Sequence, residues 1–360
     1  MLARALLLSV FLLPGPNRRA APAVPPATTT RQMNAVRAAA GIAAAYPLAA
    51  VRDLSRQGIR SSLGTDGRTI DVHIGSRQIA ILPPLRRSAP VAVPFAPSKQ
   101  TGGRAAVVLE PFATELGLGA SAGAAEATAL QQTGFTVTLL RDSQVTVQSM
   151  ADLSADSAMY VETHAGRLDD GDAVVATGQT DTSGLSALFK DGSVIQVFVA
   201  GDPQKTLYVG VTGTFFADHT NPFLAHSLLF LNGCSVLGDA TFWGDLHAHN
   251  LATLISWDND AISTTEDDAG RVIMSSMASG ATASQAVQAA RDAGLGISIA
   301  NGNVARLGLA GDGSLTLAGS TTPTRSPAPV PSATPARSPP PPTTGHPRQL
   351  CIARYQFCPR

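Results

Sequence analysis

Short apolar runs alternate with amphipathic stretches from about residue 105 to residue 318. Apolar runs of about four to eight residues between turn residues are typical of buried strands, whereas longer Ala-rich stretches are typical of helices. On this basis we predict strands at residues 105–109, 135–140, 157–163, 194–200, 207–212, 228–231, 252–257, 307–309 and 315–317, and helices at 119–133, 143–153, 239–250, 270–278 and 284–293. This alternation predicts an α/β fold with a largely parallel sheet.

The preceding residues, 24–103, are organised differently. Residues 35–54 have a helical composition, and residues 69–82 alternate as a hairpin does, with Gly75-Ser76 at its turn. A Pro-rich linker follows at residues 83–97. We therefore expect a small N-terminal region at 24–103, ahead of a main domain at 104–318.

The first residues are typical of a secretory signal. An apolar run at residues 5–13 follows Arg4, and Ala21-Pro22-Ala23 supplies a small-residue cleavage pattern. We predict a signal peptide at residues 1–23 and an exported protein, extracellular or on the cell surface. The alternative is a Pro-rich arm on a cytoplasmic protein.

The last residues form a Pro-rich tail, at residues 319–360. Residues 321–350 contain 10 prolines with Ser, Thr, Ala and Arg between them, a composition typical of extended, disordered chain. Cys351 and Cys358 could close a small disulfide loop in an exported protein. The third of the 3 cysteines, Cys234, is left as a candidate free thiol.

The formal net charge of zero is a cancellation between unlike segments. Residues 1–105 hold 14 Lys/Arg against 3 Asp/Glu, residues 106–318 hold 7 against 23, and residues 319–360 hold 5 Arg and no acid. An acidic main domain argues against a nucleic-acid partner, because a nucleic-acid-binding domain is basic. Opposite charges favour docking of the N-terminal region on the main domain, where it could act as an inhibitory pro-segment. The alternative is a small separate domain without an inhibitory role.

Two reactive side chains follow predicted strands. His164 comes after residues 157–163, and Cys234 comes after the strand that starts at residue 228. Ligand sites in open α/β sheets lie at the carboxyl ends of strands, so the imidazole and the thiol share one edge if the strands are neighbours. A Cys beside a His is the arrangement of nucleophilic thiol catalysis. Read alone, however, a Cys after a buried strand is more often a packed apolar residue.

The sequence resembles the clan CD cysteine peptidases, which share the caspase-like fold of caspases, gingipains and CHAT domains. The resemblance rests on an apolar strand that runs into His164-Ala165-Gly166 and on another that runs into Asn232-Gly233-Cys234-Ser235. It extends over about residues 104–318, including the strand that ends at Trp257 and the Ala-rich helix near residue 285. Ala165 and Gly233 stand where the family has Gly and Ala. The resemblance implies a caspase-like α/β/α sandwich with a mostly parallel sheet.

The resemblance also implies an activity, that of a cysteine endopeptidase acting on protein or peptide substrates without a metal or an organic cofactor. Cys234 would be the nucleophile and His164 the general acid/base, and the backbone N–H groups of Gly166 and Cys234 would bind the oxyanion. Trp257 and Asp258 would line the pocket for an Arg or Lys before the cut, with Asp260 in reserve. The alternative function is a non-catalytic caspase-like surface or interaction module.

Other motifs carry less weight. Asp169, Asp170 and Asp172 could bind Ca²⁺, but they lack EF-hand spacing, and a solvated acidic loop is the preferred interpretation. His247 and His249 lie two apart on a predicted helix, where they do not share a face. No apolar run reaches the roughly 20 residues of a membrane-spanning helix.

Overall fold

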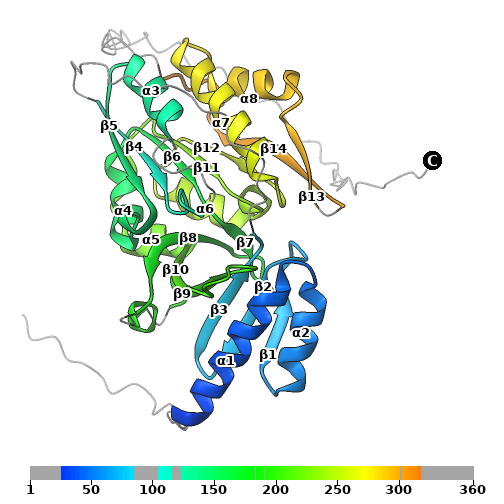
Figure 1. Ribbon diagram of the computed structural model, residues 1–360. Helices are drawn as coiled ribbons and strands as arrows, with labels where there is room; N and C mark the ends of the chain where they lie inside the picture. The colour runs from blue at the N-terminus through cyan, green and yellow to red at the C-terminus, as the bar shows by residue number, and fades with distance from the viewer. Residues whose placement is uncertain are drawn as a thin grey trace, which may run out of the picture. The chain divides into compact units, whose positions relative to one another are not determined.

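The computed structural model describes residues 26–84, 104–115, 123–182, 184–189, 191–300 and 302–317 (Figure 1). All of them belong to one compact unit, Met1–Gly319. The predicted signal peptide, the predicted tail with Cys351 and Cys358, and most of the predicted linker lie outside the described residues.

A mostly parallel sheet of seven strands forms the centre of the main domain. Its strand order is β13-β14-β12-β11-β6-β4-β5, and the five strands from β12 to β5 run parallel. β14 pairs antiparallel with β12, and β13 pairs antiparallel with β14. The strands are β4 (Arg104–Glu110), β5 (Phe135–Arg141), β6 (Ala158–Glu162), β11 (Leu228–Asn232), β12 (Thr253–Trp257), β13 (Ile297–Ala300) and β14 (Asn303–Gly311).

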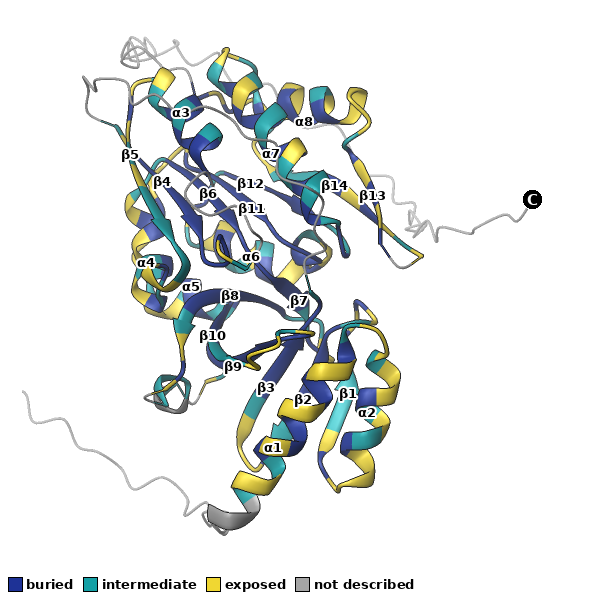
Figure 2. Cartoon of the chain, viewed as in Figure 1, coloured by how far each residue is buried: buried dark blue, intermediate teal, exposed yellow. Residues whose placement is uncertain are grey.

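Helices cover both faces of this sheet, because its strands are apolar on both sides. Tyr160 and Phe230 face a core formed with α3 (Ala124–Gln132), α7 (Ser263–Ala278) and α8 (Ala283–Asp292). Their neighbours Val161 and Leu229 face the opposite core, formed with α4 (Val147–Asp152), α5 (Gly213–His219) and α6 (Ala240–Ala248). Alternate residues of a strand point to opposite faces, so one apolar run feeds both cores. The result is a sheet covered by helices on both faces, which confirms the α/β fold with a largely parallel sheet that the alternation of elements predicts (Figures 1 and 2).

A second seven-stranded sheet joins the N-terminal region to the main domain. Its order is β1-β2-β3-β9-β10-β8-β7, and only the pair β3–β9 is parallel. The strands are β1 (Arg60–Leu63), β2 (Ile70–Ile74), β3 (Arg77–Leu82), β7 (Ala165–Arg167), β8 (Ala173–Thr180), β9 (Val194–Val199) and β10 (Leu207–Thr212). The predicted boundary at residues 103/104 therefore divides a continuous sheet, to which the N-terminal region and the main domain both contribute strands.

Two helices cover the outer face of the N-terminal strands. These are α1 (Pro26–Ala43) and α2 (Pro47–Arg56), and they pack on Ile70, Val72 and Ile74. The helical composition of residues 35–54 is confirmed, and it is divided between two helices, the second of which begins at Pro47, a position where a helix tolerates proline.

The remaining predicted elements compare with the structure as follows. The hairpin at residues 69–82 is confirmed by β2 and β3, which pair antiparallel through a turn at Gly75. Residues 315–317 do not form the predicted strand; Thr316 makes only an isolated bridge with Thr282. The elements without a prediction are β1, β7, β8, β13 and α5.

Among the described residues, none of the helices combines the length and the apolar character that crossing a bilayer would require.

Candidate active site

His164 and Cys234 leave the same edge of the parallel sheet. They follow β6 and β11, which are adjacent parallel strands with Glu162 paired to Asn232. Each reactive residue lies two positions beyond that pair, and the Thr163 N–H donates to the Asn232 carbonyl across the edge at 3.1 Å. The two strands are therefore neighbours. The sequence predicts His164 and Cys234 at one sheet edge on this condition, and the structure meets it.

The His164 imidazole is fully buried, with one contact to the N-terminal region and one to the main domain. Its Nε2 lies 3.2 Å from a carboxylate oxygen of Glu115, just beyond β4, and its Nδ1 lies 3.3 Å from the carbonyl oxygen of Pro83, just beyond β3. The ring of Phe112 packs edge-on against it with centroids 4.5 Å apart. Both ring nitrogens therefore have a partner, one on each side of the imidazole.

The Cys234 thiol is buried and 2% exposed, in an apolar cluster that includes Leu82, Phe112 and Leu168. Its Sγ donates weakly to the Ala261 carbonyl at 3.9 Å. Burial raises the pKa of the thiol well above its usual range, and the charges of Glu266 and Asp260 raise it further. In this state the sulfur is a thiol rather than the thiolate that attacks substrates.

The backbone at Gly166 is covered by the turn between β1 and β2, residues 64–69. A Cβ at Gly166 would lie 1.9 Å from the hydroxyl oxygen of Thr69 and 3.2 Å from a carboxylate oxygen of Asp66. The next residue, Arg167, donates its N–H to that same Asp66 oxygen at 2.7 Å. The carboxylate of Asp66 thus binds the N–H of Arg167, one residue beyond Gly166, and the β1–β2 turn covers Gly166 itself.

Two charged residues anchor this β1–β2 turn. The Asp66 carboxylate accepts hydrogen bonds from the N–H groups of Arg68 and Thr69, from the Thr69 hydroxyl and from the Arg167 N–H.

Arg68 forms an ion pair with Asp260, with Nε 3.1 Å from Oδ2, and the side chains are only 9% and 3% exposed. Asp260 also accepts from the hydroxyl of Ser235, the residue after Cys234, at 3.4 Å. We call the Arg68–Asp260 pair, together with Asp66 on Arg167, the latch.

Trp257 and Asp258 do not form a substrate pocket, which corrects the assignment that the resemblance implies. The Trp257 indole is fully buried in the core below α7 and donates to the Asn232 side chain at 3.0 Å. Asp258 is tied to Arg306, whose N–H donates to its carboxylate at 2.6 Å. The indole is thus closed off from solvent, whereas the Asp258 carboxylate is half-exposed.

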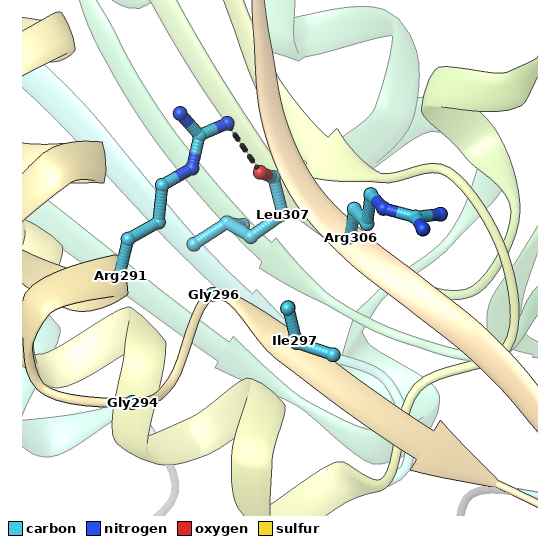
Figure 3. A pocket seen from close by; sticks show the side chains of 6 residues that line it. All are labelled: Arg291, Gly294, Gly296, Ile297, Arg306 and Leu307. Carbon is cyan, nitrogen blue, oxygen red and sulfur yellow. Dashed lines mark hydrogen bonds between the residues drawn. The ribbon is translucent and has the colours of Figure 1, made fainter. Parts of the chain in front are cut away.

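A hollow of about 300 Å³ lies on the other side of Arg306 (Figure 3). It is lined by Arg291, Gly294, Gly296, Ile297, Arg306 and Leu307, and Arg291 turns its guanidinium to the Leu307 carbonyl at 2.9 Å. Since both charged lining residues are cationic, this hollow does not suit an Arg or Lys side chain.

The histidines of the predicted helix at 239–250 do not meet at one point either. Nδ1 of His247 lies 3.2 Å from the Leu251 carbonyl, and Nε2 of His249 lies 3.0 Å from the Thr220 carbonyl. Each ring is bound to its own backbone partner.

Glu266, in the first turn of α7, makes the stability of the site depend on pH. It is completely buried, neither of its carboxylate oxygens has a hydrogen-bond partner among the described residues, and burial together with Asp260 and Asp267 raises its pKa from 4.5 to about 8. The folded state therefore binds a proton that the unfolded state has released. The difference in proton binding exists between about pH 4.5 and 8, so the free energy of unfolding falls as pH rises through this range. The stabilising contribution is complete below about pH 4.5 and is lost as pH rises through 8.

We expect Glu266→Gln, which stays neutral, to match the wild type in free energy of unfolding near pH 5 and to exceed it by about 2–4 kcal/mol at pH 8. Urea unfolding at both pH values measures the difference. Asp268→Asn, an exposed neighbour on the same helix, is the control and should show no such growth with pH. A constant difference for Glu266→Gln would mean that its carboxyl ionises normally.

No family model and no curated protein matches this chain. The interpretation of the site therefore rests on its geometry and on the residues that the sequence places there.

Proposed function

We propose that the protein is an exported cysteine endopeptidase of caspase-like fold, held in a latent form by its own N-terminal region. The observation that carries this proposal is the register of β6 and β11, which brings His164 and Cys234 out at one sheet edge. Support also comes from the order β5-β4-β6-β11-β12 with helices on both faces, which is similar to the fold that the sequence resembles.

In the proposed reaction His164 takes the proton of the Cys234 thiol, and the sulfur attacks the carbonyl carbon of the scissile peptide bond. His164 gives a proton to the leaving amine, and water then releases the acyl group from the sulfur. Glu115 orients the imidazole through its contact with Nε2. The N–H groups of Gly166 and Cys234 stabilise the oxyanion after Asp66 has moved away. This chemistry requires no metal and no organic cofactor.

The latch explains why the described state is not the active one. The thiol is buried, its pKa is raised, and the β1–β2 turn covers Gly166 while Asp66 binds the adjacent Arg167 N–H. Arg68 meanwhile places a guanidinium on Asp260, beside the residue that follows Cys234. We propose that Arg68 occupies the pocket for the residue before the cut and that Asp260 gives this pocket its preference for Arg or Lys. Asp260 replaces Asp258 in that role.

The second candidate function is a non-catalytic caspase-like module. The observation that favours it is the same burial of the Cys234 thiol, which is also what a packed apolar cysteine shows. The two functions differ in whether any form of the full chain hydrolyses peptides.

We expect the full-length Arg68→Ala variant to hydrolyse fluorogenic peptides with Arg or Lys before the cut, and Arg68→Ala/Cys234→Ala to lose at least about 1,000-fold of that rate. Alanine differs little in size from the buried thiol, so the double variant should remain folded, which circular dichroism checks. Deletion of residues 24–103 is not a suitable test, because it removes three strands from a sheet. If no unlatched variant cleaves any peptide, or if the double variant still does, the protein is not a Cys234 peptidase.

A further inference from the structure

A second cluster of reactive side chains, which does not include His164 or Cys234, lies on the second sheet and the loop beside it. Asp71 and His73 belong to β2, and Asp169 belongs to the loop that follows β7. One ligand atom from each, two carboxylate oxygens and one imidazole nitrogen, all lie within 4.8 Å of one another. The segments are about 100 positions apart in the sequence, so the second sheet brings them together.

The period of the strand explains why two of these residues point the same way. Ile70, Val72 and Ile74 of β2 pack into the core beneath α1 and α2. Asp71 and His73 alternate with them and therefore share the opposite face. A carboxylate on an interior strand face needs a specific reason, because burial of an unpaired charge is costly.

Asp71 is the residue of the cluster whose hydrogen bonding is incomplete. It is fully buried, and among the described residues its Oδ1 has no hydrogen-bond partner. Its Oδ2 lies 3.4 Å from Nε2 of His73, a nitrogen that also lacks a partner with hydrogen-bond geometry. Two carboxylates and an imidazole nitrogen thus converge on one point, with a hydrogen-bonding deficit that a bound cation would satisfy.

The surroundings hold these groups in place for such an ion. The Gln78 amide donates to Asp71 Oδ2 at 3.0 Å, and the Ser62 hydroxyl donates to Asp169 Oδ2 at 2.6 Å. Outer partners of this kind orient ligating carboxylates in metal sites. His73 and Gln78 also line a groove of about 690 Å³ that extends to Asp191 and Gln196. The groove gives an ion a path from solvent and leaves room for a water ligand.

We propose that Asp71, His73 and Asp169 form a binding site for a divalent transition-metal ion, with Zn²⁺ as the ion that fits best. One imidazole and two carboxylates, with a fourth position open to water, match the ligand set of an open tetrahedral zinc site. Ca²⁺ takes six to eight oxygen ligands, and Mg²⁺ takes an octahedron of oxygens, so a nitrogen ligand disfavours both. The ion would link β2 to the loop after β7. This loop follows Arg167, whose N–H donates to Asp66. The site is independent of the proposed peptidase chemistry.

The test uses the full chain with Cys351→Ser and Cys358→Ser, so that thiols outside the described residues do not compete for zinc. After treatment with EDTA and its removal, isothermal titration with ZnCl₂ should show one site per chain, and MgCl₂ and CaCl₂ at the same concentration should give no comparable binding. We expect His73→Gln and Asp169→Asn each to weaken zinc binding by at least about 10- to 100-fold. X-ray absorption of the zinc complex should show nitrogen and oxygen ligands without sulfur.

His219→Gln is the matched control, because its Nε2 faces a single carboxylate, Asp191, at 2.8 Å near the same groove. It should bind zinc as the parent does. Asp169 is exposed, so Asp169→Asn should fold even if a variant at buried Asp71 does not. Zinc should also raise the melting temperature of the parent and leave that of His73→Gln unchanged. Failure of the parent to bind zinc overturns the proposal, as does equal zinc binding by the parent, His73→Gln and Asp169→Asn.

Discussion

Replacing Arg68 by alanine is expected to expose the Cys234 thiol to alkylation. Arg68 and Asp260 form a nearly buried ion pair, and removal of one partner of such a pair costs about 3–5 kcal/mol, since the other charge is left uncompensated. Burial already raises the pKa of Asp260 to about 6, so protonation offsets part of this cost. The β1–β2 turn should then leave Arg167 and Gly166 more often. We expect iodoacetamide to label Cys234 at least about tenfold faster, the change that about 1.4 kcal/mol produces.

Labelling must be assigned by peptide mass spectrometry, because Cys351 and Cys358 also carry sulfur. Arg56→Ala is the matched control: it removes an arginine of the same region whose side chain is 75% exposed and pairs with Asp53 on the surface. Its labelling rate should equal that of the wild type, because exposed ion pairs contribute little. Equal labelling in Arg68→Ala and in Arg56→Ala would show that the latch does not control access to the thiol.

The sequence was sufficient to predict the α/β class of the main domain and the position of His164 and Cys234 just beyond strands, whereas the pairing that puts them at one edge is seen only in the structure. Both follow from local patterns, namely the apolar runs and the position of each reactive residue just after a strand. The second sheet has no such local signal, since its key pairing joins β3 at residue 79 to β9 at residue 196. The turn at Asp66-Gly67 is recognisable as a turn, but its partner Arg167 lies 101 positions away. Hence the latch could not be predicted.

The incorrect assignment of Trp257 has a different origin. A strand end shows which edge a residue approaches, but the side chain still has two faces to choose between. Ile255 and Trp257 lie two apart in β12, share a face and pack together in the core with α7. The two-residue period therefore already placed the indole in the same core as Ile255. The Asp260 role could not be found this way, because it depends on contact with Arg68 of another segment.

Asp260→Asn separates the two roles that we propose for the latch. It breaks the same ion pair as Arg68→Ala, so it should expose Cys234 to alkylation to a similar extent. It also removes the carboxylate that would bind the substrate guanidinium. A charge-assisted pair of this kind in a buried site is worth about 2–4 kcal/mol, so the preference in kcat/KM for Arg over Gln before the cut should fall by about 30-fold or more relative to Arg68→Ala.

The comparison requires one peptide library, varied only at the residue before the cut and assayed with Arg68→Ala, Asp260→Asn and Arg68→Ala/Asp258→Asn. The third variant removes a nearby acid that is bound to the backbone of Arg306, and it should keep the Arg or Lys preference of Arg68→Ala. A latch without a specificity role predicts that all three variants share one preference. Loss of the Arg preference in the Asp258 variant but not in Asp260→Asn would mean that Asp258, which directly follows β12, binds the substrate side chain instead. Loss in Asp260→Asn alone would mean that Arg68 holds the place of a substrate side chain in the latent protein.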